Sequence, residues 1–249
     1  MPVEPKLAAT VVLLRERLGG IESEDECEFE VFMAKRHKNT KFMSEHHVFP
    51  GGALDDQDLT KESRVRLVGI NEDITEKLRE ICEDPANLWI TAIRELFEET
   101  GILIATTKTR ESLGIIEEKP KKIKKYQKSL QKKRKTMTDV LVKENLYYNA
   151  DSLSYFGRLI TPKVSPIRFD TQFFLCKYPQ NQNINLFRNE LTEGLWGSPK
   201  QLLDKFKKKQ IKLIFPQYST LQRLNKFKTI HEVFENSKVV SSRNRLNDF

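Results

Sequence analysis

Apolar residues occur in short runs separated by polar stretches, as in chains that fold around a buried sheet. Residues 7–14 and 29–34 form two such runs, separated by a turn signal at Gly19 and Gly20 and by an acidic stretch. Runs of this length predict buried strands. The same pattern predicts further strands at 102–105, 153–161, 169–178 and 191–196.

The clearest helical pattern spans residues 85–100. Asp84 is a typical N-cap, Pro85 suits a first helical turn, and Gly101 is the residue type that most often ends a helix. Further helices are predicted at 198–208, 218–227 and 230–236. Strands and helices interleave along the chain, which predicts an α/β fold of packed layers. We expect one domain over residues 1–249, because this length supplies one well-buried core with insertions.

Residues 119–147 fit two structures. Ile123, Leu130 and Met137 are evenly spaced among polar residues, which fits an amphipathic helix, but the composition fits disorder equally well. The part from Lys119 to Lys135 holds ten Lys or Arg and no acidic residue, and it accounts for the formal charge of +8. We expect a solvated insertion here, with contact to RNA, DNA or anionic lipid through this segment as the alternative. A nucleic-acid-binding face on the rest of the chain is not indicated.

Cysteine usage and hydropathy indicate the compartment. Cys27, Cys82 and Cys176 are far apart, which fits neither a disulfide framework nor a zinc-ligand spacing. There is no apolar run of about 18 residues, no leader pattern and no peroxisomal address at Phe249. No contact with a membrane is expected, and the cytoplasm is the expected location.

Three carboxylates share one side of the helix predicted at 85–100. Each residue of a helix advances by about 100°, so Glu95, Glu98 and Glu99 fall within about 100° of one another. The apolar residues on the opposite side are Trp89, Ile90, Ile93, Leu96 and Phe97. Glutamates this close repel one another, and magnesium is bound by a few carboxylates together with phosphates and water. Arg94 is placed to orient Glu98, four residues later.

Residues 94–102 read RELFEETGI, and the loop VFPGG precedes them at 48–52. The combination resembles the Nudix family, whose signature is Gly, five residues, Glu, seven residues, then Arg-Glu, an aliphatic residue, any residue, Glu-Glu, any residue, Gly and an aliphatic residue. The second half matches at every specified position. The first half is split, because Gly52 lies too far before Arg94. The equivalent of the family's first Glu stays open between Asp58 and the position of Ala86.

The resemblance implies a Nudix-type α/β/α sandwich with a mixed β-sheet, extended by C-terminal helices and by two insertions at about 53–84 and 107–150. It implies magnesium or manganese held by Glu95, Glu98 and Glu99 with the main-chain carbonyl near Gly51. Arg94 takes the orienting role already assigned to it.

Within the implied catalytic set, Glu95 is the first candidate and Glu98 the second for deprotonating the attacking water. Glu190 and Glu193 are candidates for one more carboxylate, and ordinary surface acids are the alternative for both.

The stretches FMSEHHVFPGG at 42–52 and RFDTQFF at 168–174 narrow the resemblance to the acyl-coenzyme A diphosphatase-like branch of the family. This implies hydrolysis of coenzyme A or its thioesters to adenosine 3′,5′-bisphosphate and (acyl-)phosphopantetheine. Arg36, Gly52 and Arg168 are the candidates for binding this nucleotide-containing substrate, and Lys35 is a further cation near them. The alternatives are another Nudix substrate, such as ADP-ribose, a dinucleotide or a nucleoside triphosphate, or a non-catalytic module that holds RNA through its lysine-rich insertion.

Overall fold

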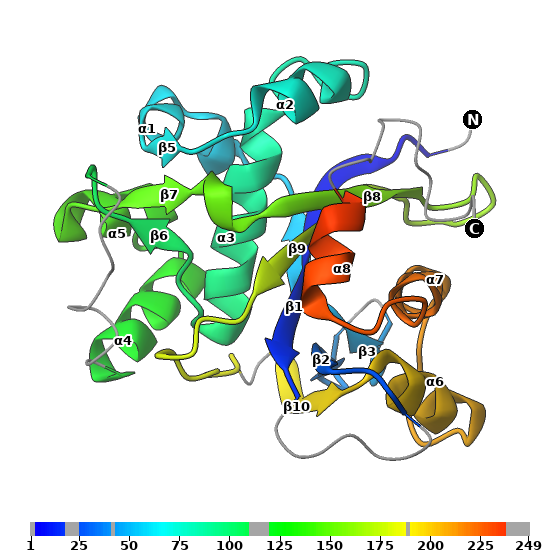
Figure 1. Ribbon diagram of the computed structural model, residues 1–249. Helices are drawn as coiled ribbons and strands as arrows, with labels where there is room; N and C mark the ends of the chain where they lie inside the picture. Colours follow the sequence, from blue (N-terminus) through cyan, green and yellow to red (C-terminus); the bar gives the residue numbers. More distant parts are fainter. Residues whose placement is uncertain (1–2, 18–24, 41–42, 110–119, 188–189, 238–249) are drawn as a thin grey trace.

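A mixed β-sheet forms the centre of the fold (Figure 1). The computed structural model describes residues 3–17, 25–40, 43–109, 120–187 and 190–237. The strands of this sheet are β1 (Lys6–Glu16), β2 (Phe29–Arg36), β3 (His47–Val48), β4 (Gly51–Ala53), β8 (Ser154–Ile160), β9 (Phe169–Lys177) and β10 (Leu191–Gly197). The main path runs β10-β2-β1-β9-β8, with β3 beside β2 and β4 beside β1. β1 and β9 are parallel, and the other pairs are antiparallel.

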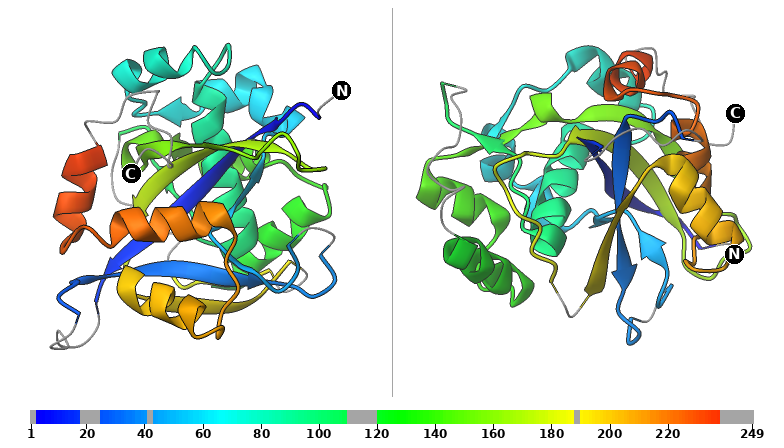
Figure 2. Two further views of the ribbon diagram at one scale, coloured as in Figure 1. Left: turned by 90° about the vertical axis from the view of Figure 1, so that its right-hand side faces the viewer. Right: turned by 60° about the horizontal axis from the view of Figure 1, so that its bottom comes forward.

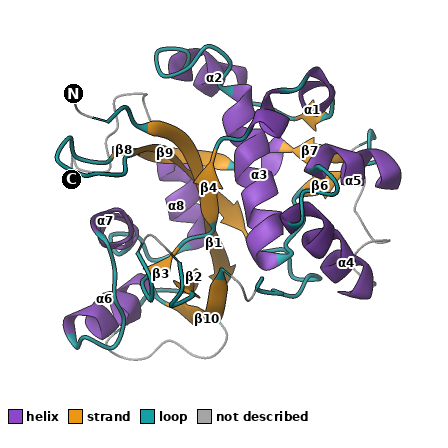
Figure 3. Ribbon diagram, turned by 180° about the vertical axis from the view of Figure 1, so that it is seen from behind, coloured by secondary structure: helices purple, strands orange, loops and turns teal. Residues whose placement is uncertain are grey.

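Helices cover both faces of this sheet. The helix α3 (Ala86–Thr100) lies on one face, and α6 (Pro199–Lys207), α7 (Phe215–Leu224) and α8 (Ile230–Ser237) pack on the other. Figures 1 and 3 show α3 and α8 on opposite sides of β1 and β9, and Figure 2 shows α6 and α7 from two more directions. The α/β class and the sandwich around a mixed sheet, both predicted from the sequence, are confirmed.

Side chains of β1 serve both layers because neighbours on a strand point to opposite faces. Val11 and Leu13 belong to the core beneath α3, whereas Val12 and Leu14 belong to the core beneath α6, α7 and α8. All four are fully buried.

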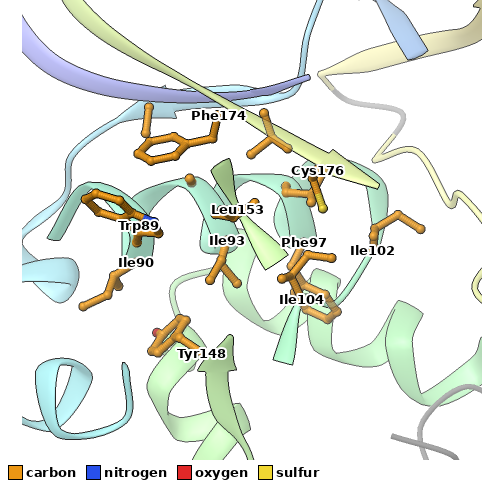
Figure 4. Close-up of a cluster of buried hydrophobic side chains, with 14 of the residues drawn as sticks. Trp89, Ile90, Ile93, Phe97, Ile102, Ile104, Tyr148, Leu153, Phe174 and Cys176 are labelled. Carbon is orange, nitrogen blue, oxygen red and sulfur yellow. The ribbon is translucent and has the colours of Figure 1, made fainter. Parts of the chain in front are cut away.

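α3 itself is buried on two sides. Trp89 packs against Phe174 of β9 with 4.9 Å between ring centroids, and Figure 4 shows Phe174 and Cys176 on one side of the helix and Tyr148 on the other. Such a helix is held by packing along most of its circumference, so the side chains that it presents at its ends are fixed in direction.

The two insertions build a small layer against the second side of α3. The first contains η1 (Asp56–Leu59), α1 (Lys61–Val65), β5 (Leu67–Val68) and α2 (Glu72–Leu78), and the second contains α4 (Pro120–Gln131), α5 (Met137–Glu144), β7 (Tyr147–Asn149) and η2 (Ala150–Ser152). Strands from both join β6 (Ala105–Thr106) in a sheet of order β5-β7-β6. A buried chain of hydroxyls links them, from Ser63 to Thr138 at 2.8 Å and from Thr138 to Tyr148 at 3.0 Å.

Several predicted elements differ from the structure. The strand expected at 102–105 is wrong in position, because β6 begins only at Ala105. The segment expected to be one helix or disordered forms two helices, α4 and α5, since the lysine-rich helix has an apolar side that packs on the protein. α3 begins one residue later than expected, at Ala86, and α7 begins at Phe215.

Other expectations concern residues outside the described ranges or the whole chain. The turn at Gly19 and Gly20 and the end of the chain at Phe249 lie outside the described residues. No helix in the described ranges has the length and apolar character needed to cross a bilayer.

Candidate active site

The last turns of α3 present the three carboxylates that the sequence placed on one side. Gly101 ends the helix in the left-handed conformation, with φ of 73°, and its N–H donates to Phe97 O at 2.8 Å. The side chains of Glu95 and Glu98 keep 15% and 14% exposure, whereas Glu99 is buried. The cluster is therefore set into the surface, with two of its three members open to a ligand.

The glycine loop closes on this cluster from the sheet. β4 pairs with β1 so that Gly51 lies opposite Thr10 and Gly52 opposite Ala9. The N–H of Gly51 donates to Glu99 Oε2 at 2.9 Å. A Cβ on Gly52 would lie 2.5 Å from Glu95 Oε1, so the glycine leaves the room that this carboxylate occupies beside the strand. Residues separated in sequence by the first insertion thus meet here.

Arg94 joins the cluster to η1 and to the residue that follows the glycine loop. Its Nε and Nη2 atoms donate to the two oxygens of Asp58, both at 2.8 Å, and Nη2 also donates to Ala53 O at 3.0 Å. Its Nη1 donates to Glu95 Oε1 at 2.7 Å and lies 3.6 Å from Glu98 Oε1. Arg94 therefore orients Glu95 more closely than Glu98, the partner expected from helical spacing.

Asp58 is the residue that sequence reasoning left undecided. It is fully buried, and Thr91 Oγ1 donates to it at 2.9 Å. Ala86, the other candidate position, is buried among apolar residues and offers no charge to Arg94. The spacing in the sequence could have identified Asp58. In the family signature the first Glu follows the Gly by six positions, and Asp58 follows Gly52 by six. The extra residues of the split signature therefore come after Asp58.

Negative charge exceeds positive charge in the cluster. The pKa of Glu98 is raised to about 7, chiefly by burial and also by the charges of Glu95 and Asp58, which together outweigh the lowering effect of Arg94. Burial and the charge of Glu95 raise the pKa of Glu99 well above its ordinary value, and burial also raises that of Glu95. A bound cation would relieve this repulsion, because it favours the charged form of each carboxyl.

The donor set fits a hard divalent cation whose shell is shared with other ligands. In the described part of the chain, no three acidic, histidine or cysteine side chains already converge as a complete metal-ligand set. Magnesium does not require such a cage, because it keeps several waters and binds through one or two carboxylates plus substrate phosphates. Glu95 and Glu98, with their partial exposure, and Glu99 behind them are oxygen donors of this kind.

Two more charged residues lie near the cluster. The charge of Glu190 raises the pKa of both Glu95 and Glu99, while the charge of Arg36 lowers the pKa of Glu99 and of Glu190. Arg36 and Glu190 were both candidates from the sequence, and the structure brings them together beside the carboxylates.

The remaining candidates lie elsewhere. Glu193 is exposed, and its charge partly opposes the burial that lowers the pKa of His47. Arg168 is buried, and its guanidinium donates to Thr161 O at 3.0 Å and to Val3 O at 2.6 Å. Lys35 lies 4.0 Å from Glu45 in an exposed ion pair. The structure gives Arg168 backbone partners near the start of β1, and its role in substrate binding stays a prediction.

Comparisons with known proteins agree with this geometry. The family profile described as the NUDT19 Nudix domain matches residues 68–224. The chain is 25% identical over 236 residues to "Acyl-coenzyme A diphosphatase NUDT19" of Xenopus laevis, covering 83% of this chain and 62% of that protein. It is 30% identical over 200 residues to "Putative nudix hydrolase 7" of Caenorhabditis elegans, covering 80% and 56%. The chain thus spans about three-fifths of the length of these relatives.

One solved structure is similar over nearly the whole fold. It is the NUDIX hydrolase from Alicyclobacillus acidocaldarius, with a TM-score of 0.70 and 24% sequence identity, covering 97% of this chain and 99% of that one. This likeness concerns the arrangement of the sheet and helices.

Proposed function

Because the NUDT19 Nudix domain profile matches residues 68–224, the chain belongs to the Nudix hydrolase family, and we propose a specific reaction for it. In this proposal the protein hydrolyses the diphosphate bond of coenzyme A or of an acyl-coenzyme A. The products are adenosine 3′,5′-bisphosphate and (acyl-)phosphopantetheine. The observation that carries the proposal is the meeting of Gly51 and Gly52 with Glu95 and Glu99 across the split signature.

Each residue of the cluster has a task in this proposal. Glu95, Glu98 and Glu99 hold a divalent cation, magnesium or manganese, together with the main-chain carbonyl of Gly51. When bound, such a cation neutralises phosphate oxygens and makes water more acidic. Arg94 fixes the direction of Glu95 through a hydrogen bond of 2.7 Å.

The chain also supplies the proton acceptor. Glu95 is the first candidate for accepting the proton of the attacking water, and Glu98 is the second. Both side chains retain partial exposure, and the carboxylate of Glu95 lies directly beside Gly52. Since the backbone and Arg94 hold the groups in place before substrate binds, little reorganisation is required during the reaction.

The identity of the substrate rests on two lines of support. Curated relatives from Xenopus laevis and Homo sapiens carry the name acyl-coenzyme A diphosphatase, at 25% and 23% identity. Beside the carboxylates, Arg36 supplies positive charge toward Glu99 and Glu190, as a site for a polyanion requires.

Product analysis tests this proposal. The protein is incubated with Mg²⁺ and, separately, acetyl-coenzyme A, ADP-ribose and NADH, and the products are identified by mass spectrometry. We expect adenosine 3′,5′-bisphosphate and acetyl-phosphopantetheine from the first substrate. If only ADP-ribose or only NADH is cleaved, the proposed substrate is wrong and the cleaved compound indicates the substrate class. If none of the three is cleaved, the proposed activity is contradicted.

A further inference from the structure

The lysine-rich helix α4 forms one wall of a groove beside the C-terminal end of α3. The groove has a volume of about 530 Å³, and its walls include Lys124, Lys128, Lys132, Gln131, Phe187 and Glu190. This size suits a nucleotide-sized ligand. Phe187 lines the groove and its N–H donates to Glu99 O at 3.0 Å, so the groove lies beside the end of the helix that carries the carboxylates.

α4 is fixed against the end of α3, beside which Figures 1 and 3 show it. Its Gln127 side chain is buried and donates to Phe97 O at 3.2 Å and to Glu98 O at 3.3 Å. Tyr126 and Leu130 are buried on the same side of the helix. On the outer end, Lys122 Nζ and the Tyr126 hydroxyl both donate to Glu144 of α5.

The opposite wall is built onto the same end of α3. The N–H of Asn185 donates to Thr100 O at 2.7 Å, and the N–H of Phe187 donates to Glu99 O at 3.0 Å. Asn185 Nδ2 also donates to Gln127 Oε1 at 2.5 Å, which ties this wall to α4. Both walls thus hold a constant position relative to the carboxylates.

Lys124 and Lys128 of α4 line this groove, and so does Lys132, which directly follows the last residue of the helix and whose N–H still donates to Lys128 O at 3.3 Å. On a helix a spacing of four residues places side chains along one side, and all three lysines are exposed. In the described ranges none of the three has an ion-pair partner, whereas Lys122 is paired with Glu144. Each therefore offers its ammonium group to an anion in the groove.

We propose that Lys124, Lys128 and Lys132 bind a phosphomonoester that the substrate carries outside its scissile diphosphate. The inference rests on the proposed function, because the diphosphate occupies the carboxylate site. A phosphomonoester carries close to two negative charges and three acceptor oxygens, so several ammonium groups can bind it together. In coenzyme A this group is the 3′-phosphate. The lysine-rich insertion is then a determinant of substrate specificity.

The test compares coenzyme A with 3′-dephospho-coenzyme A, which differs only in that phosphate. A triple variant with Lys124→Gln, Lys128→Gln and Lys132→Gln removes the three charges, and Lys121→Gln, Lys125→Gln and Lys135→Gln removes three exposed charges outside the groove as a control. We expect the groove variant to raise KM for coenzyme A about tenfold or more, with kcat and the KM for the dephosphorylated substrate within about twofold. The control variant should resemble the wild type.

Two results would overturn the proposal. One is an equal rise in KM for both substrates, and the other is an equal loss in the control variant, which would indicate general electrostatic attraction. Calorimetric binding of adenosine 3′,5′-bisphosphate and of AMP separates this inference from the proposed function. If the wild type hydrolyses neither substrate, a preference for the bisphosphate that only the groove variant loses still supports the lysine site, and no preference refutes it.

Discussion

Arg94 and Asp58, separated by 36 positions in the sequence, form a two-pronged ion pair that is almost fully buried. The pair joins the carboxylate helix to the short helix η1 directly after the glycine loop. The split signature keeps its geometry because the inserted residues begin only after Asp58. Asp58 itself therefore stays close enough to the glycine loop to pair with Arg94. The extra residues then fold against the far side of α3 without disturbing the site.

Asp58→Ala should destabilise the protein by roughly 3–5 kcal/mol, because it leaves the buried guanidinium of Arg94 without its counter-charge. Urea unfolding measures the change. The control is Asp56→Ala, an exposed neighbour on the same short helix, which should change the free energy of unfolding by about 0.5 kcal/mol or less. Equal stabilities of the two variants would show that the ion pair does not hold the site together.

Gly52→Ala should reduce activity more than stability. The added Cβ would lie 2.5 Å from Glu95 Oε1 and 2.8 Å from Oε2, so the carboxylate must turn away from its position beside Arg94. We expect a loss of about tenfold or more in kcat, because misplaced catalytic groups lose rate steeply, with a far-ultraviolet circular dichroism spectrum like that of the wild type. Wild-type kcat in this variant would mean that the close approach of loop and carboxylate has no part in the reaction.

Magnesium should stabilise the protein more at about pH 8 than at about pH 5.5. The folded-state pKa of Glu98 is raised from 4.5 to about 7, so without metal the folded state binds more protons than the unfolded state between these values. The contribution of Glu98 to the stability of the metal-free protein therefore falls as pH rises from about 4.5 towards 7, and a cation offsets that loss. Melting temperatures with and without saturating Mg²⁺ at the two pH values measure the effect.

The same titration with Glu98→Gln is the control, since this variant lacks the carboxyl in question. Its Mg²⁺-dependent rise in melting temperature should vary less with pH than that of the wild type. A wild-type rise that is equal at both pH values, or larger at the acidic one, would count against metal binding by these carboxylates.

Thr138→Val should uncouple the two insertions. Its hydroxyl is buried between Ser63 and Tyr148, and valine keeps its shape while removing both hydrogen bonds. We expect a loss of about 1 kcal/mol, since the hydrogen bonds to Ser63 and Tyr148 are lost while Ser63 Oγ keeps its bonds to Gln57 O and Thr60 Oγ1. A double-mutant cycle with Ser63→Ala measures the coupling, and strictly additive effects would show that the two hydroxyls do not act together.

The sequence predicted the parts of the fold that local periodicity determines. The 3.6-residue pattern places Trp89, Ile93 and Phe97 in the core, and the structure buries all three. The short strands β5, β6 and β7 are different, because each has only two or three residues and depends on partners far away in the chain. No local signal distinguishes such segments from loops.

Long-range contacts also explain what was missed in the site. Asp58 lies in a polar stretch, and its importance comes from Arg94, which the first insertion separates from it in sequence. The lysine-rich segment was expected to be solvated, since its charge outweighs its few apolar residues. In the structure Tyr126 and Leu130 are buried and Gln127 donates to the end of α3, which together hold α4 on the protein, while Lys124 and Lys128 stay exposed.

The most direct test of the central claim is the initial rate of adenosine 3′,5′-bisphosphate formation from coenzyme A with Mg²⁺. Wild type is compared with Glu98→Gln, in the carboxylate cluster, and with Glu193→Gln, an exposed glutamate outside it. The account predicts that Glu98→Gln lowers kcat by about 100-fold or more, while Glu193→Gln stays within about twofold of the wild type. A Glu98→Gln protein that forms the product at the wild-type rate would contradict the assignment of this helix as the catalytic site.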